Sequence, residues 1–460
     1  MEETMSNEVD VQSIAQNARF SRFHSLILFW CVLILVLDGY DLAVVGAALP
    51  SIMKQMGVDA AKAGFMASSA LFGMMFGAIY LGTLADKIGR PVSICVCIAL
   101  FSFFTAAAGL THDPLSFSVT RFLAGLGIGG VLPIVTAQMG EFAPRKIRAR
   151  LVTIVFAGYS IGGILVALTG KQLIETYGWQ SVFFIAGTPI LVIPFILLTM
   201  PDSLAFLVQR NRTEKLVQVI KRIAPEVQVS SRDRFVMPQE AMVTKAPVAK
   251  LFQDGRGFST VMIWVAFFMG LFMVYSLSSW LTKLMAMSGY SLGSALTFVL
   301  VFNIGAVIGA VGGGWLGDRY NIKHVLVAFY ATGAVSLALM GYTKSTELLF
   351  LVVFVVGACT LGTQLLAYAY AGEFYPAAIR STGVGFASGI GRLGAIAAPV
   401  LIGMLVAMRL PLEQNFLAIA LAGVLGTIAV MMIDHRRCAA NTHGAAVLPP
   451  HADIRSSASS

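Results

Sequence analysis

The chain has 460 residues, of which 57% are hydrophobic and 12% are charged. A soluble domain carries about 25% charged residues, so this composition excludes an ordinary soluble protein and predicts a polytopic membrane protein. The net charge of +9 does not indicate nucleic-acid binding, because the basic residues cluster in short connections, as the positive-inside rule expects.

The first segment, residues 1–24, is a polar tail, and we expect no cleavable signal peptide there. Twelve apolar runs follow, most of them long enough to cross a bilayer as a helix. They cover residues 25–50, 63–83, 92–110, 116–139, 150–171, 180–200, 258–281, 292–315, 324–342, 347–370, 382–408 and 414–433. The basic residues near alternate connections and the even number of runs predict that both termini lie in the cytoplasm.

Residues 201–257 form the longest connection between apolar runs. Within it, Leu207, Leu216, Val217 and Ile220 are spaced among Arg and Lys residues, a pattern that predicts an amphipathic cytoplasmic helix. The connection is too short, and too poor in catalytic residue types, for a catalytic domain. The last segment, residues 434–460, is polar and is predicted to be disordered.

The first apolar run is interrupted by two carboxylates, Asp38 and Asp41, in the sequence LDGYD. A charge inside a membrane is costly and marks a candidate functional site. Residues three apart share a face of a helix, so the pair is a candidate site for proton uptake and release. The alternative is that both carboxylates pair with structural Arg or Lys residues.

Two motifs recur along the chain. GTLADKIGR, which contains Asp86, is echoed by GWLGDRYNI, which contains Asp318, and GEFAPRKIR, which contains Glu141, is echoed by GEFYPAAIR, which contains Glu373. Both carboxylates recur after 232 residues, which indicates two homologous halves, residues 25–200 and 258–433. Transporters are commonly built from such repeats, with the substrate site between them.

These motifs resemble those of the major facilitator superfamily, over nearly the whole membrane part of the chain. GTLADKIGR is similar to the family's loop between spans two and three, and RFLAGLGIGG is similar to its fourth-span motif. PDSLAFL resembles the segment after span six in sugar-porter-like branches. Within the superfamily, DGYD and GRLGAIAAP resemble the aromatic acid:proton symporters. The resemblance implies an all-α membrane protein of two six-helix bundles.

The same resemblance implies a function. It predicts import of a benzoate-like aromatic carboxylate with protons, by alternating access, across a bacterial inner membrane. The proton gradient would drive transport without a cofactor, and we expect a monomer. The alternatives are a transporter of an aliphatic acid or sugar, a drug exporter, or a sensor of the same fold. Export is disfavoured because the fifth span, GYSIGGILVALTG, lacks the proline of drug antiporters. An enzyme is not expected, since no nucleophile, metal-ligand spacing or phosphate-binding loop is apparent.

Two arginines lie inside apolar runs. Arg121 is predicted to take part in proton coupling with a nearby Asp, or alternatively to extend to the membrane interface. Arg392 lies deeper, and its guanidinium group matches a substrate carboxylate. Its other predicted role is as a permanent partner of Asp38 or Asp41. The two roles could also alternate during transport.

The remaining predicted site residues fall into two sets. Candidate substrate contacts are Tyr40, Tyr159, Gln138, Gln364 and Asn303, with Tyr275, Trp280, Tyr368 and Tyr370 as further aromatic candidates. The amides among them have the alternative of interhelical hydrogen bonds, and the rings have the alternative of simple packing. Candidate gating residues at the cytoplasmic ends are Asp86, Arg90, Glu141, Arg148, Asp318, Arg319, Glu373 and Arg380. For the glutamates and their arginines we expect salt bridges between spans.

Overall fold

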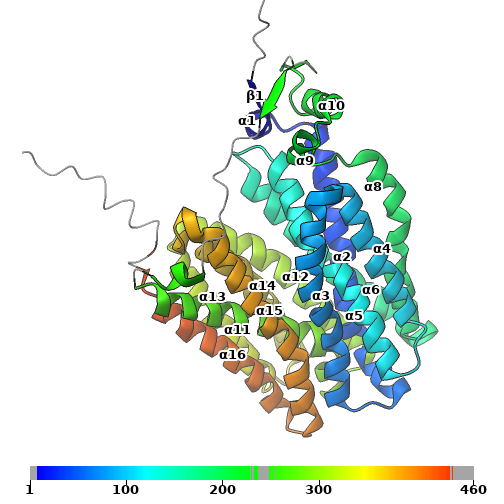
Figure 1. The fold of residues 1–460 in the computed structure, drawn as a ribbon. Coiled ribbons are helices and arrows are strands. Elements are labelled where there is room, and N and C mark those ends of the chain that lie inside the picture. The colour runs from blue at the N-terminus through cyan, green and yellow to red at the C-terminus, as the bar shows by residue number, and fades with distance from the viewer. Residues whose placement is uncertain are drawn as a thin grey trace, which may run out of the picture.

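The computed structural model describes residues 8–227, 229–230, 233–236, 248–253, 255–435 and 438. It is almost entirely helical (Figure 1). The C-terminal segment that was predicted to be disordered is residues 434–460. Apart from residues 434, 435 and 438, it lies outside the described residues.

The described residues contain twelve helices that are long and apolar enough to cross a membrane, which confirms the prediction of twelve spans. The first six spans are α2 (Arg22–Met56), α3 (Ala60–Ile88), α4 (Arg90–Ala108), α5 (Pro114–Phe142), α6 (Arg148–Tyr177) and a composite of α7 (Gln180–Gly187), η1 (Thr188–Val192) and α8 (Ile193–Thr199). The last six are α11 (Gly257–Met287), α12 (Leu292–Arg319), α13 (Ile322–Met340), α14 (Thr346–Phe374), α15 (Ala377–Ala407) and α16 (Leu412–Met432).

Several helices extend beyond the apolar runs because polar residues cap their ends. Asp59 accepts a hydrogen bond from the backbone N–H of Lys62 at the start of α3, and Asp113 accepts two at the start of α5, as N-cap residues commonly do. The sixth span is interrupted by η1, which contains Pro189 and precedes Pro194. Proline removes a backbone donor and disturbs the regular helix.

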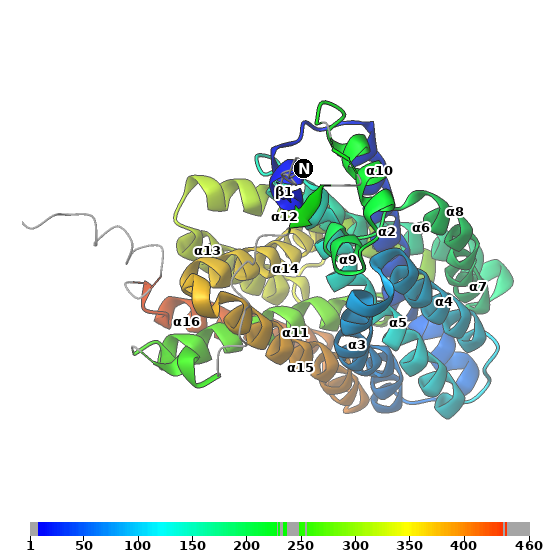
Figure 2. The ribbon, with the colours of Figure 1, turned by 45° about the horizontal axis from the view of Figure 1, so that its top comes forward.

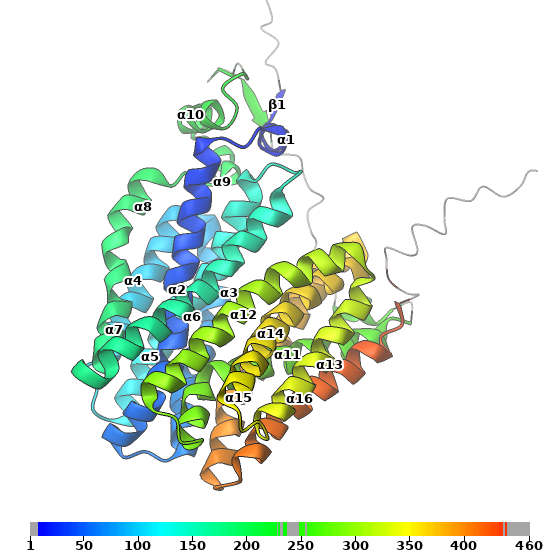
Figure 3. The same cartoon turned by 180° about the vertical axis from the view of Figure 1, so that it is seen from behind.

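The spans form two bundles that meet along three pairs of helices, α2 with α11, α3 with α15 and α6 with α12. The side chain of Ser68 on α3 donates a 2.8 Å hydrogen bond to the carbonyl of Ile396 on α15. The ammonium group of Lys171 on α6 lies 3.3 Å from the hydroxyl of Thr297 on α12. These contacts lie away from the end that carries α9 (Leu204–Gln209) and α10 (Thr213–Ile223). Toward that end the bundles diverge (Figures 1 and 3).

The first part of the connection, with α9 and α10, folds onto the N-terminal bundle, whereas η2 (Val248–Phe252) contacts α11 and α15. The predicted amphipathic helix is present as α10, with Leu216, Val217 and Ile220 buried. It does not extend back to Leu207, which lies on α9, because the chain turns between the two helices at Asn211, where φ is 52°. Beside α9 and α10, β1 (Glu8–Asp10) pairs in parallel with β2 (Arg234–Val236), and α1 (Val11–Asn17) contacts α10 (Figure 2).

Candidate functional site: a cavity between the bundles

A cavity of about 120 Å³ lies between the two bundles. Its wall is mainly apolar, with a few polar groups from both halves. It is lined by Asp38, Leu71, Met74, Leu132, Phe156, Tyr159, Leu271, Val274, Tyr275, Leu361, Gln364, Leu365, Tyr368, Arg392 and Ala395. An engineered apolar cavity of about 150 Å³ accepts benzene, so the space is of the order required by one aromatic ring.

Arg392 brings a positive charge into this wall. It lies on α15, is partly buried, and donates a 3.3 Å hydrogen bond from Nη1 to the carbonyl of Met74 on α3. Among the described residues the ion pairs involve other arginines, so Arg392 forms no direct ion pair with Asp41 or with Asp38, which lines the same cavity. The predicted role as a permanent partner of an aspartate is therefore not observed. A guanidinium without a carboxylate partner can bind an anion in the cavity.

Asp38 also lines the cavity and is 1% exposed. Its Oδ1 atom is buried without a hydrogen-bond partner among the described residues. The next residue, Gly39, lies against the backbone of Tyr159 on α6, where any added Cβ would overlap the carbonyl of that residue. This close crossing of α2 and α6 places Asp38 and Tyr159 side by side in the cavity wall.

Asp41 lies in a different environment, inside the N-terminal bundle. Its Oδ1 forms a 2.5 Å ion pair with Nη1 of Arg121 on α5, and both side chains are fully buried. The hydroxyl of Thr105 on α4 donates to the same carboxylate at 2.8 Å. The guanidinium of Arg121 also lies over the ring of Phe183. The alternative that Arg121 extends to the membrane interface is wrong, because this side chain is 0% exposed.

Three predicted substrate contacts do not line the cavity. Tyr40 shares a 2.9 Å hydrogen bond with Thr169, and the amide of Gln138 donates to the carbonyl of Pro201 at 2.8 Å. Asn303 donates at 2.9 Å to the carbonyl of Val299 in its own helix and borders a separate void of about 30 Å³, too small for a ring. In this structure these side chains hydrogen-bond within the protein, and their contact with substrate stays a prediction.

The other candidates divide in the same way. Tyr159, Gln364, Tyr275 and Tyr368 line the cavity with Arg392. Trp280 instead donates to the carbonyl of Pro399, and Tyr370 packs beside His435 at one end of the C-terminal bundle.

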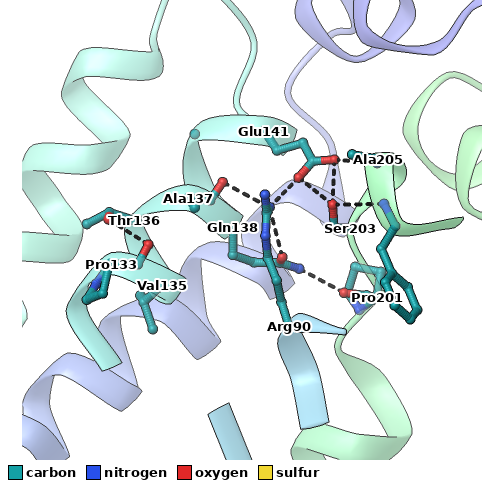
Figure 4. Close-up of polar contacts among 12 residues, drawn as sticks. Arg90, Pro133, Val135, Thr136, Ala137, Gln138, Glu141, Pro201, Ser203 and Ala205 are labelled. Carbon is teal, nitrogen blue, oxygen red and sulfur yellow. Dashed lines mark hydrogen bonds and ion pairs between the residues drawn. The ribbon is translucent and has the colours of Figure 1, made fainter. Parts of the chain in front are cut away.

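A polar cluster joins α4, α5 and the segment after the sixth span (Figure 4). Arg90 forms an ion pair with Glu141 and donates at 3.1 Å to the carbonyl of Ala137. The carboxylate of Glu141 accepts hydrogen bonds from the hydroxyl of Ser203, at 2.9 Å, and from the backbone N–H of Ala205, at 3.0 Å. The cluster therefore ties the start of α9 to the N-terminal bundle.

The expected partners of the two glutamates are corrected by the structure. Glu141 pairs with Arg90, whereas Arg148 donates at 2.5 Å to the carbonyl of Gly140. In the second repeat, Glu373 is exposed and forms no ion pair within the described residues, and Arg380 donates at 3.4 Å to the carbonyl of Tyr375. The second repeat keeps the glutamate but has Ile322 at the position of Arg90, so the ion pair is not repeated.

Asp86 and Asp318, the predicted gating carboxylates, are both exposed. Within the described part of the chain neither side chain makes an ion pair or a hydrogen bond. Arg319 lies over the ring of Trp315 in its own helix. These residues lie at the end where the bundles diverge.

Two residues of these clusters were not predicted from the sequence. Thr105 hydrogen-bonds both Asp41 and Arg121, at 2.8 and 2.5 Å, yet it is one hydroxyl among many in apolar runs. Ser203 lies in the PDSLAFL motif. This motif resembles the sugar-porter segment, but the resemblance assigned no role to its serine. The position of that motif directly after span six was the available signal.

Comparison with known proteins matches this architecture. The family model described as Major Facilitator Superfamily matches residues 31–399 and 298–446. The chain belongs to the major facilitator superfamily. It is 41% identical over 439 residues to the benzoate transport protein of Acinetobacter baylyi, covering 94% of each chain. It is 34% identical over 432 residues to the 4-hydroxybenzoate transporter PcaK of Pseudomonas putida, covering 93% of this chain and 96% of the relative.

Solved structures agree on the fold. The crystal structure of a D-xylose-proton symporter superposes with a TM-score of 0.69 at 19% identity, covering 88% of this chain and 96% of the symporter chain. At this identity the likeness concerns the fold alone. Together with the twelve apolar helices, it establishes a multi-pass membrane protein with the architecture of this superfamily.

Proposed function

We propose that this chain imports a benzoate-like aromatic carboxylate with protons across a bacterial inner membrane. The observation that carries the proposal is Arg392, which lies in the wall of a mainly apolar, ring-sized cavity and forms no direct ion pair among the described residues. An apolar cavity with one guanidinium group matches an apolar ring with one carboxylate. The names of the benzoate and 4-hydroxybenzoate transporters that the chain resembles support the same substrate class.

The proposed proton site is the buried cluster of Asp41, Arg121 and Thr105, with Asp38 as its neighbour in the cavity. A carboxylate inside a membrane that pairs with a buried arginine is a typical element of a proton relay. Protonation of Asp41 would release Arg121 from its ion pair. The proton gradient supplies the energy in this proposal, and no cofactor takes part.

Alternating access is proposed from the contacts between the bundles. In this proposal both termini lie in the cytoplasm, and the side closed by the contacts of Ser68 with Ile396 and of Lys171 with Thr297 is the periplasmic one. Asp86 and Asp318 lie at the opposite, open side. They are proposed to make contacts between the bundles only when that side closes. Each monomer contains a complete cavity, so we propose a monomeric transporter.

The test is uptake of labelled benzoate into cells that express the chain, with and without a protonophore. Saturable uptake that collapses with the protonophore is the expected result. Uptake no greater than in cells with an empty vector, for benzoate and for hydroxylated benzoates alike, would overturn the proposed function.

A further inference from the structure

Gln364 is a polar residue in the cavity wall whose hydrogen bonds are not satisfied by the protein. It lies on α14 and is 6% exposed. Both polar atoms of its amide, Oε1 and Nε2, are buried without a hydrogen-bond partner among the described residues. A buried polar group left without a hydrogen-bond partner is destabilising, so an amide in this state at the edge of a binding cavity requires an explanation.

The neighbouring helix leaves space for this amide. A Cβ added to Gly270 on α11 would lie 3.1 Å from Oε1 of Gln364 and 2.5 Å from the hydroxyl of Tyr330. Tyr330 donates its hydroxyl to the carbonyl of Ala266, at 2.6 Å. Gly270 therefore leaves room for the amide of Gln364 but gives it no hydrogen-bond partner. The last torsion of a glutamine is broad, so the amide can rotate toward a bound molecule.

The helix register relates Gln364 to Arg392. Tyr368 on α14 and Ser388 on α15 share a 2.7 Å hydrogen bond, so they lie at one depth. Gln364 precedes Tyr368 by four residues and Arg392 follows Ser388 by four, along helices that run in opposite directions. Each therefore lies about 6 Å from the level of the Tyr368–Ser388 pair, in the direction of the side where the two bundles contact each other. The guanidinium and the unpaired amide thus lie at a similar depth in two walls of one cavity.

The two groups prefer different chemistry. A guanidinium group only donates hydrogen bonds and matches a carboxylate, whereas an amide carries both a donor and an acceptor. A second carboxylate would leave the Oε1 atom of Gln364 facing another acceptor. A hydroxyl group can accept from Nε2 and donate to Oε1, which satisfies both atoms. The amide is therefore suited to a hydroxyl group, not to the acid group of the substrate.

We propose that Gln364 recognises a hydroxyl group on the ring of the substrate while Arg392 holds the carboxylate. The inference rests on the proposed function and makes it more specific. The transporter then prefers a ring-hydroxylated aromatic acid to benzoate itself. The physical reason is that a site built to hydrogen-bond a substrate hydroxyl disfavours the analogue that lacks it.

The test is uptake of labelled benzoate, 3-hydroxybenzoate and 4-hydroxybenzoate by cells that express the wild type, Gln364→Leu or Gln364→Met. Leu366→Met serves as a matched control, because Leu366 is buried on the same helix outside the cavity lining and the change nearly conserves volume. Unlabelled 2-hydroxybenzoate is a second control, as its hydroxyl lies beside the carboxylate and cannot reach a separate wall. The amount of each variant in the membrane is measured in parallel.

For the wild type, we expect the 3- or the 4-hydroxy acid to have a half-saturating concentration about tenfold or more below that of benzoate. Gln364→Leu and Gln364→Met should remove most of this difference, so that the half-saturating concentrations of the hydroxy acid and of benzoate converge. Leu366→Met should retain the preference, and 2-hydroxybenzoate should compete about as well as benzoate.

Equal half-saturation by benzoate and both hydroxy acids in the wild type would overturn the role of Gln364 while leaving the proposed function intact. The same conclusion would follow if both Gln364 variants were present in the membrane and kept the wild-type preference. Failure of the wild type to transport any of these aromatic acids would instead overturn the proposed function. The two failures are therefore distinguishable.

Discussion

Replacing Asp41 with asparagine tests the proposed proton site most directly. Asparagine has nearly the same size and keeps one acceptor oxygen, so Thr105 and Arg121, at 2.8 and 2.5 Å from the carboxylate, can still donate to it. The variant loses the negative charge and the capacity to bind and release a proton. We therefore expect a folded carrier that exchanges substrate across the membrane without coupling to protons.

The size of the effect follows from burial and from the gradient. Arg121 and Asp41 are both 0% exposed, and removal of one partner of a buried ion pair costs about 3–5 kcal/mol. Asp41→Ala should approach this loss in the free energy of unfolding. Asp41→Asn should lose less, because it keeps an acceptor. For transport, a proton gradient of about 100 mV supplies about 2.3 kcal/mol per coupled proton, or about fiftyfold accumulation, which the variant should lose.

The assay uses purified protein in lipid vesicles. Accumulation driven by an imposed proton gradient is compared with counterflow, in which labelled substrate enters vesicles preloaded with unlabelled substrate. Asp41→Asn should show counterflow but no accumulation, whereas the matched control Thr105→Ser, which keeps a hydroxyl group beside the same carboxylate, should show both. Wild-type accumulation by Asp41→Asn would refute the assignment of Asp41.

Three further predictions concern other parts of the chain. Arg392→Lys keeps the charge but loses the planar fork, so the half-saturating concentration of substrate should rise several-fold; an unchanged concentration dependence of uptake would contradict the carboxylate site. Glu141→Gln should lower the free energy of unfolding by about 1–3 kcal/mol, because Glu141 binds Arg90 and Ser203. The control is Glu373→Gln, at the equivalent position of the second repeat, which should change the free energy of unfolding by less than about 0.5 kcal/mol. Equal losses for the two variants in a denaturation assay would refute the structural role of Glu141. Burial raises the pKa of Asp202, although Lys215 and Arg212 oppose the shift. The native state therefore binds the Asp202 proton more tightly than the unfolded state does, so stability falls as pH rises through the raised pKa. Asp202→Asn should raise the unfolding temperature at pH 7 but not near pH 3. A gain that is independent of pH would argue against this cause.

The fold was predictable because hydropathy is a property of each segment alone. Every apolar run corresponds to a helix or, for the sixth, to a composite of three. The predicted runs were shorter than the helices because capping residues such as Asp59 and Asp113 are polar. The interruption of the linker helix at Asn211 was missed because a single residue with positive φ leaves little trace in a periodic pattern.

The site was predictable in its charges but not in its partners. Asp38, Asp41, Arg121 and Arg392 were identifiable because a charge inside an apolar run is costly. Which arginine pairs with which aspartate depends on the rotation of α2 against α5 and α15, and hydropathy does not determine that rotation. Gln138 illustrates the same difficulty, since its amide reaches the carbonyl of Pro201, a contact across 63 residues of sequence.

The different environments of the two aspartates constrain how proton and substrate can be coupled. Asp41 faces Arg121 inside the N-terminal bundle, and Asp38, about 4.5 Å away along the same helix, faces the cavity. A void of about 10 Å³, close to the size of one water molecule, is lined by Arg121 and by Tyr275, and Tyr275 also lines the cavity. In the proposed mechanism, the substrate therefore need not contact Asp41. Its binding beside Asp38 and Tyr275 can act on the buried ion pair through one helix and one shared ring.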